Sequence, residues 1–364
     1  MAGTGAGHDG LGMVRRSRTE VRATGMTLFV FLALVQDGIT TGAIYLLLAI
    51  GLLIVFSVTR VIFVPQGDLL AFGTLSAAAL QAGRVPGTVW LLDAGAAVAL
   101  IAALFGGRRA ALRGLLAWGL YPAVVTAAAL WLAPRQLPAV SILLALAIVT
   151  PMGPLTWRFA FRPIADASVL ALLILAMALH FVLIGIGLVL FGPEEASVPA
   201  LTEASFDLGV LTVSGQSLAV LVCCAALVGG LRWFFGATLS GKALRAAASE
   251  RLGARLVGID AGASGALALG LAGFIAALAG VLIGAVTPLS YDAGFDIGLK
   301  GFVAAIMGGL ISYPAAAAGA LLVGVLESLG SFWASAYRDV IVFTLLIPVL
   351  VWLSVRGRAV EDRA

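Results

Sequence analysis

Charged residues are scarce in this sequence, and their scarcity excludes an ordinary soluble domain. Asp, Glu, Lys and Arg make up 11% of the 364 residues, whereas hydrophobic residues make up 62% and the mean hydropathy is +1.11. A soluble domain carries about 25% charged residues. Apolar runs of roughly 20 residues, enough to cross a bilayer, fill most of the chain. Because helices satisfy their own backbone in lipid, and because the alternation of a β-barrel is missing, we predict an all-α, polytopic membrane protein.

Cysteine and histidine are nearly absent, which removes common ligands for metals and common groups for catalysis. The two cysteines, Cys223 and Cys224, are adjacent in an apolar run, so they suit packing rather than a disulfide framework or a metal site. His8 lies in the N-terminal tail, and His180 stands alone on an apolar span as a packed or pore-facing histidine. No Ser-His-Asp arrangement and no pair of poised carboxylates is visible. We therefore predict no catalytic residue, no metal site and no enzyme activity.

Positive charge is in slight excess, with 22 Lys and Arg against 18 Asp and Glu. These basic residues sit in short loops, where they set membrane topology, so they do not indicate a nucleic-acid partner. The basic segments 106–113, 158–162, 240–256 and 356–358 are predicted to be cytoplasmic. The loop 192–215 contains acidic residues but neither Lys nor Arg, so we expect it on the outer side.

Three regions follow from this pattern: a polar, basic tail over 1–25, a membrane domain over 26–355, and a cytoplasmic tail over 356–364. Arginines precede the apolar run that begins at Met26, which is similar to a twin-arginine signal peptide. The run continues without a small-residue cleavage site, so an uncleaved first span is favoured.

Eleven spans, within a range of 10–12, are predicted from the apolar runs. The residues Gln36-Asp37-Gly38 divide the first run into a short piece, 26–35, and a full span. To keep the basic tail inside, residues 26–36 are predicted to be tilted or re-entrant. The predicted spans are 39–58, 67–83, 87–106, 114–133, 137–156, 168–191, 216–236, 262–286, 296–312, 315–335 and 339–355.

A polar helix is predicted over 241–259, between two apolar spans. Ser240 can cap its start and Gly258 can close its end. Its apolar residues recur every four positions and form one stripe, so the helix must bury this stripe in the headgroup layer or against another protein. The stripe consists of Leu244, Ala248, Leu252 and Leu256.

A near-match to a phosphate-binding loop starts this region, at Gly236-Ala-Thr-Leu-Ser-Gly-Lys-Ala243. The final position is alanine, so the hydroxyl that binds magnesium is missing, and the segment follows a membrane span instead of a strand. We interpret the match as accidental and predict that this chain does not hydrolyse ATP.

Ionisable residues within apolar spans are costly and mark cavities or partners, and four occur here: Asp68, Asp93, Lys300 and Glu327. For the last three, a charge at a helix end that reaches the interface is an equal alternative. In Val64-Pro-Gln-Gly-Asp68, Pro and Gly interrupt a helix, so free backbone groups would line a substrate path, or the segment is a plain turn between helices.

Several blocks together resemble the permease subunits of branched-chain amino acid ABC importers, specifically the first of the two paired permeases. They cover roughly 38–83 and 153–355, and each block alone is weakly specific. They are Gly38-Ile-Thr-Thr-Gly-Ala-Ile-Tyr45, Ile62-Phe-Val-Pro-Gln-Gly-Asp68, Arg158-Phe-Ala-Phe-Arg-Pro163, the helix 241–259, Ala276-Ala-Leu-Ala-Gly-Val-Leu282, Gly298-Leu-Lys-Gly-Phe302, Ala304-Ala-Ile-Met-Gly-Gly309 and Tyr337-Arg-Asp-Val340.

The chain also departs from the family pattern. Gln66 and Asp68 stand where His and Glu are common, which leaves the substrate open, and Ser312-Tyr-Pro-Ala315 replaces the usual Ile-Pro-Gly. Residues 87–150 exceed the family core and are interpreted as an inserted helical pair within 114–156.

The resemblance implies a division of labour among subunits. Two permeases, alike or different, form the pathway in the bacterial inner membrane, surrounded by lipid. Two cytoplasmic ABC ATPases, which bind ATP and Mg, drive transport, a periplasmic protein delivers the amino acid or small amide, and no cofactor belongs to this chain. The cytoplasmic loop 237–260 would dock on an ATPase through Gly241, Leu244, Arg245, Ala248, Glu250, Leu252, Leu256 and Gly258. The pathway candidates are Pro65, Gln66, Gly67, Asp68, Lys300, Gly308 and Gly309.

Two alternatives remain at this point. The loop helix would instead lie on anionic headgroups. The whole chain would instead be a self-contained secondary transporter or channel, which needs charged relays or inverted repeats, and the sequence shows no convincing repeat.

Overall fold

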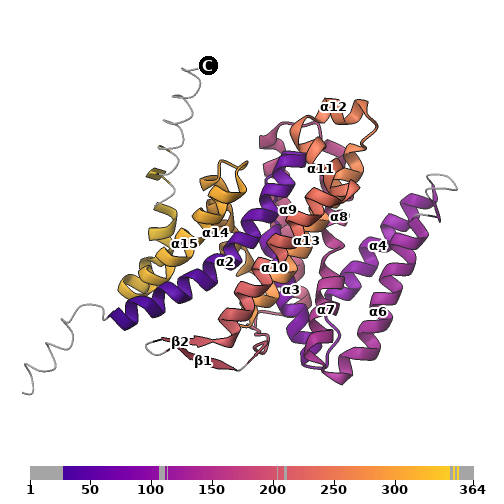
Figure 1. Cartoon of the computed structure of the whole chain (residues 1–364). Coiled ribbons are helices and arrows are strands. Elements are labelled where there is room, and N and C mark those ends of the chain that lie inside the picture. Colours follow the sequence, from indigo (N-terminus) through magenta and orange to yellow (C-terminus); the bar gives the residue numbers. More distant parts are fainter. Residues whose placement is uncertain are drawn as a thin grey trace, which may run out of the picture.

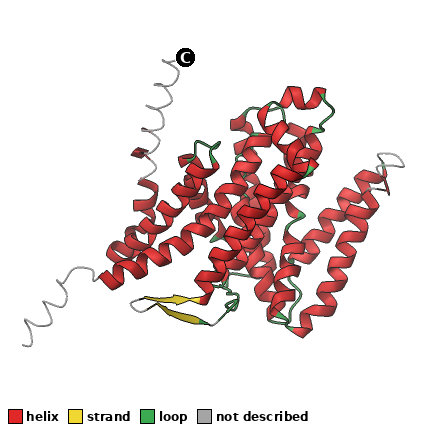
Figure 2. Cartoon of the chain, in the orientation of Figure 1, coloured by secondary structure: helices red, strands yellow, loops and turns green. Residues whose placement is uncertain are grey.

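The computed structural model describes residues 28–105, 111–112, 114–202, 204–208, 211–344, 347–348 and 351. These residues form a helical bundle with one short hairpin (Figure 2). The tails 1–25 and 356–364, most of the basic loop 106–113 and part of the span 339–355 lie outside the described residues. The elements are α2 (Leu28–Thr59), α3 (Gln66–Gln81), α4 (Thr88–Leu104), a π-helical turn (Leu115–Leu120), α6 (Tyr121–Leu132), α7 (Pro138–Val149), α8 (Met152–Thr156), a second π-helical turn (Trp157–Phe161), α9 (Val169–Phe191), β1 (Ser205–Leu208), β2 (Leu211–Ser214), α10 (Gly215–Ala237), α11 (Leu239–Ser249), α12 (Arg251–Leu256), α13 (Ala261–Gly284), α14 (Gly294–Met307) and α15 (Tyr313–Ala334), with 3-10 turns at 133–135, 162–164 and 335–337.

The predicted all-α membrane fold is confirmed. Each of the ten predicted spans between 39 and 335 coincides with a helix or with a continuous run of helical segments. Within the described residues, seven of these are long and apolar enough to cross a membrane, judged by length and composition. The helices α3, α4 and α14 are shorter, with 16, 17 and 14 residues.

The first helix corrects one prediction. Residues 28–59 form a single helix, so the expected break at Gln36–Gly38 and a re-entrant segment over the described part of 26–36 are wrong. The Thr40 hydroxyl donates to the Gln36 carbonyl at 3.0 Å and supports the helix there. Gly38 serves packing instead, because a Cβ at this position would lie 2.5 Å from the Cα of Val325 on α15.

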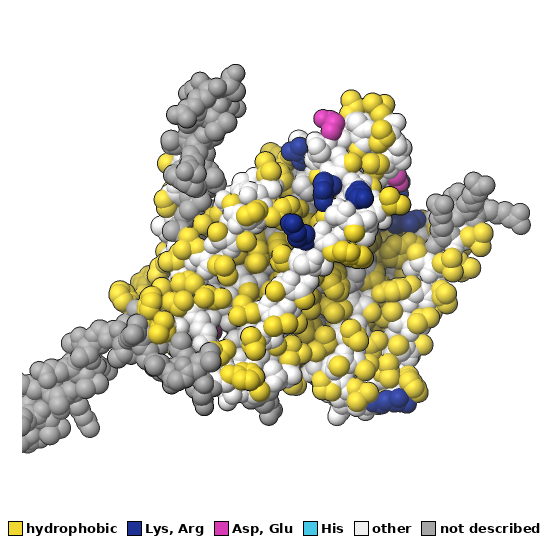
Figure 3. Space-filling model, in the orientation of Figure 1, with side chains coloured by type: hydrophobic (Ala, Val, Ile, Leu, Met, Phe, Trp, Pro, Cys, Tyr) yellow, Lys and Arg dark blue, Asp and Glu magenta, His cyan; other side chains and the backbone are white. Residues whose placement is uncertain are grey.

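The two ends of the bundle differ in charge. At the end where α11 and α12 lie, Lys and Arg side chains gather, and we call it the basic end (Figure 3). There Arg255 Nη2 lies 3.6 Å from Asp166 Oδ1. Because Asp166 follows the loop 158–162 closely in the chain, this ion pair places the loops 158–162 and 240–256 side by side. The antiparallel strands β1 and β2 lie at the opposite end, together with the start of α2 (Figure 1). We call this the hairpin end. The acidic loop 192–215 thus contains a hairpin, which its sequence pattern did not predict.

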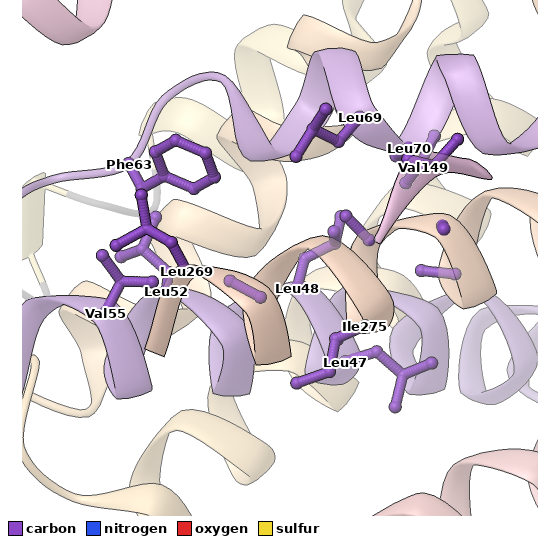
Figure 4. Packing of buried hydrophobic residues seen from close by; sticks show 14 of the residues in the cluster. Leu47, Leu48, Leu52, Val55, Phe63, Leu69, Leu70, Val149, Leu269 and Ile275 are labelled. Atoms are coloured by element: carbon purple, nitrogen blue, oxygen red, sulfur yellow. The ribbon is translucent and has the colours of Figure 1, made fainter. Parts of the chain in front are cut away.

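Small residues bring the central helices close together. Leu47 and Leu48 of α2, Leu70 of α3 and Ile275 of α13 are buried together (Figure 4). A Cβ on Gly280 of α13 would lie 2.1 Å from the Leu70 carbonyl oxygen, so only glycine permits this approach. The core therefore forms where α2, α3 and α13 meet. Of the two spans predicted as an inserted pair, α7 and α8 pack on α3 and α13, whereas α6 lies at the edge beside α4.

Two helices start inside the bundle. After α2 ends at the basic end, the chain turns back, and the side-chain Nε2 of Gln66 donates to the Leu48 carbonyl at 3.0 Å. At about 1.5 Å per residue, α3 thus starts roughly 16 Å inward from the end of α2. A Cβ on Gly67 would lie 2.2 Å from the Gly294 oxygen, and a Cβ on Gly294 would lie 2.2 Å from the Gly67 oxygen. The first turns of α3 and α14 therefore touch reciprocally.

This contact relates two similar units of opposite direction. One unit is α2 followed by the short α3, and the other is α13 followed by the short α14. α2 runs toward the basic end and α13 runs toward the hairpin end, and each short helix runs back (Figure 1). We call these two units of opposite direction the inverted pair, which is a relation between helix directions and contacts. The contact joins Gly67 and Gly294, which lie far apart in the sequence, so the sequence pattern did not reveal it.

The glycine at the α3–α13 contact provides a test of this packing. Gly280→Ala should lower the thermal midpoint of the purified protein, because overpacking a close contact costs about 1–3 kcal/mol. Gly229→Ala on α10 is the matched control, since no atom lies within 4 Å of its Cβ; it should leave the midpoint unchanged or raise it. Dye-based melting in detergent measures the midpoints. Equal midpoints for the two variants would contradict the packing.

Candidate functional site

A buried carboxylate–imidazole contact lies at the start of α3. Asp68, in the first turn, where a helix N-terminus favours a carboxylate, has both oxygens 2.9 Å from Nδ1 of His180 on α9. Both side chains are almost fully buried. The His180 ring also stacks on Phe295 of α14, with centroids 4.5 Å apart. His180 is therefore packed, which is one of the two alternatives predicted for it, and it has a polar partner in Asp68. The 112 residues that separate it from Asp68 hide the pair in the sequence.

The segment Val64–Asp68 is more than a turn at the surface. Pro65 precedes the first residue of α3, where a missing N–H costs no helix bond. The Oε1 of Gln66 is buried without a hydrogen-bond partner in the described part of the chain. Gln66 and Gly67 line a mainly apolar cavity of about 170 Å³, together with Phe295 and Gly298 of α14. The structure thus brings Gln66, Gly67 and Asp68 to the point where α3 and α14 meet.

A second buried network surrounds Lys300 on α14. Its ammonium donates to Glu327 on α15 and lies 3.1 Å from Asp339 Oδ1. The hydroxyl of Tyr45 on α2 donates to the other oxygen of Glu327. Lys300 is therefore a buried cation paired with two carboxylates, and the alternative of a side chain that reaches the interface is wrong for it. Such a pair fixes three helices against one another, since an unpaired charge would be costly here.

Asp93 has a simpler environment. Both its carboxylate oxygens accept from the Thr126 hydroxyl, at 3.0 and 2.9 Å, so it joins α4 to α6. The predicted packing role of the cysteines also fits the structure, because Cys224 is buried and its thiol lies 3.4 Å from the Ala43 carbonyl.

The predicted pathway residues Gly308 and Gly309 lie elsewhere. They form the turn from α14 to α15 at the basic end, where Gly309 has φ +62° and a Cβ on Gly308 would lie 2.6 Å from the Ser312 oxygen. Lys300 is eight residues earlier on α14, about 12 Å away along the helix. The structure therefore does not bring these glycines together with Lys300 or Asp68.

The predicted loop helix consists of two helices. Thr238, not Ser240, caps α11, because its hydroxyl accepts from the Gly241 amide at 3.0 Å. The helix ends at Glu250, whose φ of −148° and ψ of 104° are extended. The Glu250 carboxylate then caps α12 by accepting from the Leu252 amide at 3.1 Å. The expected single helix over 241–259 is wrong. A side-chain oxygen that accepts from a backbone amide, and a negative charge at a helix N-terminus, both stabilise a helix start, so Glu250 favours a new helix after it. Gly258, at φ +86°, closes the end of α12 as predicted.

The break changes which side chains can meet a partner. Leu244 is 1% exposed, and Gly241 approaches Phe234 so closely that its Cβ would lie 2.2 Å from that carbonyl oxygen. These residues therefore pack within the chain. Leu252 and Leu256 on α12 are 67% and 80% exposed. The predicted stripe is thus divided into an inward part on α11 and an outward part on α12.

The inward part faces a large cavity at the basic end. This cavity of about 770 Å³ lies between the second half of α2, α10, α11 and the start of α15. Leu244, Arg245 and Ala248 line it, and Arg245 Nη2 also donates to the Phe235 carbonyl at 2.6 Å. The near-match to a phosphate loop runs from the end of α10 into α11, so it follows a long helix directly and not a strand.

Comparison with known proteins places the sequence among transport proteins. Residues 110–350 match the family described as "Branched-chain amino acid transport system / permease component". The chain is 28% identical over 338 residues to the high-affinity branched-chain amino acid transport system permease protein LivH of Salmonella typhimurium, which covers 88% of this chain and 93% of that protein. It is 27% identical to LivH of Escherichia coli over 337 residues, with the same coverage. It is 28% identical over 202 residues to the permease protein BraD of Pseudomonas aeruginosa, covering 54% of this chain and 66% of that protein. No solved structure matches the chain.

The Lys300 network yields a charge-compensation prediction. Lys300→Met should lower the stability strongly, because breaking a buried pair costs about 3–5 kcal/mol. The double variant Lys300→Met with Glu327→Gln should recover part of this loss, since it leaves one fewer buried charge. Thermal midpoints of the single and double variants measure the effect. A double variant less stable than Lys300→Met alone would refute the pairing.

The Asp68–His180 contact predicts a similar asymmetry. His180→Leu leaves the buried Asp68 carboxylate without its partner, and so it should destabilise the protein by about 1–3 kcal/mol or more. Asp68→Asn with His180→Gln, which keeps two polar groups that can bond to each other, should be less damaging. The amount of folded protein after heating, measured by size-exclusion chromatography, distinguishes them. The same yield from both would show that the contact is unimportant.

Proposed function

The chain belongs to the family of branched-chain amino acid transport system permease components, and on that premise we propose that it is the membrane subunit of an ATP-binding cassette importer. Its cargo in this proposal is a branched-chain amino acid, a related amino acid or a small amide, because the relatives are named for high-affinity branched-chain amino acid transport. The family consists of permease components, so the chain is not an enzyme. ATP and Mg bind to separate ATPase subunits in this scheme.

The observation that carries the proposal is the α11–α12 segment. It lies between the spans α10 and α13 and presents Leu252, Leu256 and Val257 outward, the last at 77% exposure. Exposed leucines on a short helix outside the spans fit a groove on a partner protein. Arginines on the same segment supply a positive rim around them, which suits acidic groups on an ATPase.

The orientation follows from the distribution of charge. Arg60 lines the same cavity as Arg245 of α11, Arg162 of loop 158–162 lies beside Gly262, and Arg255 of α12 pairs with Asp166. These arginines share the basic end, so this end faces the cytoplasm in our proposal. The hairpin end then faces outward, where a periplasmic binding protein would deliver its cargo. We place the chain in the bacterial inner membrane on the same ground, with a second permease, identical or different, as its neighbour.

The packing of α11 suggests how movement would be transmitted. Because α11 packs against both α2 and α13 through buried residues such as Leu244, a push on α12 reaches both long helices. The short helices α3 and α14 follow directly after them in the chain. A rigid displacement of α11 would therefore alter the contact between α3 and α14 and change which end of the pathway is open.

A self-contained secondary transporter is the second candidate. The inverted pair of long and short helices favours it, since such transporters are often built from inverted repeats with interrupted helices. Family membership and the exposed α12 favour the importer. Uptake that requires no ATPase subunit, and that persists when ATP is depleted but an ion gradient is kept, would support the secondary transporter.

Replacing the outward leucines tests the importer. In cells that express the whole transport system, Leu252→Asp with Leu256→Asp should abolish ATP-dependent uptake of radiolabelled leucine, isoleucine and valine. The reason is that two carboxylates would be buried at the docking surface. ATPase subunits should no longer co-purify with the variant, while its amount in the membrane stays normal.

The matched control is Leu252→Met with Leu256→Met, which keeps apolar volume and should retain most uptake. Extending the assay to other amino acids and small amides defines the cargo. Normal uptake and normal ATPase co-purification in the aspartate variant would rule out docking through α12.

A further inference from the structure

A polar cavity opens at the hairpin end, away from the α11–α12 segment. Its volume is about 410 Å³, within the range of about 300–1,000 Å³ that holds small molecules. The first half of α2, the 285–293 segment, α14 and the second half of α15 form its walls. Glu195 reaches it from the segment after α9, which is tied to the 285–293 segment by paired backbone bonds of 3.0 Å between Ala196 and Leu289.

Unpaired carboxylates line this cavity. Asp37, Glu195 and Asp296 belong to three different segments, and none of them forms an ion pair within the described part of the chain. Among the residues that the structure describes, Asp37 accepts one side-chain hydrogen bond, from the Ser328 hydroxyl at 3.3 Å. The buried cation Lys300 is already paired with Glu327 and Asp339. The cavity therefore has spare negative charge, which an ammonium group would neutralise.

A guanidinium lies in the same cavity. Arg338 is about half exposed, and its one ion pair in the described residues runs from Nε to Asp339 over 3.7 Å. This weak contact leaves the two terminal nitrogens for another anion, and a guanidinium fork matches a carboxylate. The cavity thus offers opposite charges from separate elements.

The remaining wall is aliphatic. Ile44, Ile283, Val286, Leu289 and Ile297 line the cavity from α2, the end of α13, the segment that follows it and α14. Branched aliphatic side chains bury well against such a wall, because the contact removes apolar surface from water. A ligand that fits all three features carries an ammonium, a carboxylate and an aliphatic side chain.

We propose that this cavity is a binding site in the permease itself for the zwitterion of an aliphatic α-amino acid. Asp37 and Asp296 bind the ammonium, Arg338 binds the carboxylate, and the isoleucines contact the side chain. This inference rests on the proposed function and adds to it, because selection of cargo then occurs within the membrane subunit as well as on a binding protein. The buried Lys300–Glu327 pair keeps α14 and α15 in place around the site.

Direct binding to the purified full-length permease in nanodiscs, without any binding protein, tests the site. Three probes differ by one group: L-leucine, 3-methylbutylamine without the carboxylate, and 4-methylpentanoate without the ammonium. Saturation-transfer NMR should rank leucine first, the amine second and the acid last. In Asp37→Asn with Asp296→Asn, the leucine signal should fall at least about tenfold, as expected when charge-assisted hydrogen bonds are lost.

Asp292→Asn is the matched control, since Asp292 lies four residues before Asp296 and outside the cavity, with a hydroxyl contact to Ser290 at 2.5 Å. It should bind leucine like the parent, and all variants should melt at the parent temperature. Equal leucine signals from the parent and the double variant, no leucine signal from the parent, or equal binding of 4-methylpentanoate and leucine would overturn the site. ATP-dependent leucine uptake by the parent, assayed in parallel, separates failure of this site from failure of the proposed function.

Discussion

The reciprocal contact between Gly67 and Gly294 is the constraint on which the rest of the structure depends. It lets two helices begin inside the bundle, with backbone atoms closer than any side chain would permit. A helix start has free amide groups, which lipid cannot satisfy. Placing two such starts against each other, surrounded by α2, α9 and α13, keeps them away from lipid. The long and short helices of each unit then take their directions from this one contact.

Two buried polar pairs involve the short helices α3 and α14, whose first turns make the Gly67–Gly294 contact. Asp68 lies in the first turn of α3 and meets His180, and Lys300 lies two turns into α14 and meets Glu327. Each pair joins helices that are distant in sequence, so each also limits how far these helices can slide. In the proposed mechanism, such pairs would let the joined helices move together as rigid bodies.

The α11–α12 segment links this interior to the surface. Its first helix is held by a threonine cap and by buried contacts of Leu244, and its second helix is turned outward by the extended backbone at Glu250. One glutamate therefore separates a side that packs within the chain from a side that is free. A regular helix over the same residues would have placed all four stripe residues on one face.

Apolar run length and charge placement determined much of this protein from the sequence alone. They predicted the ten helices between 39 and 335 and the placement of loops 158–162 and 240–256 at one end, because these depend on local composition. The family was indicated separately, by the motif blocks that the chain shares with it. The tertiary structure alone decided that residues 28–59 form one helix, that His180 meets Asp68, and that Lys300 is paired. It also decided that Gly308 and Gly309 lie apart from the other pathway candidates. Contacts between distant residues depend on how helices pack, and no run or spacing within one segment records which residue of another helix will face it.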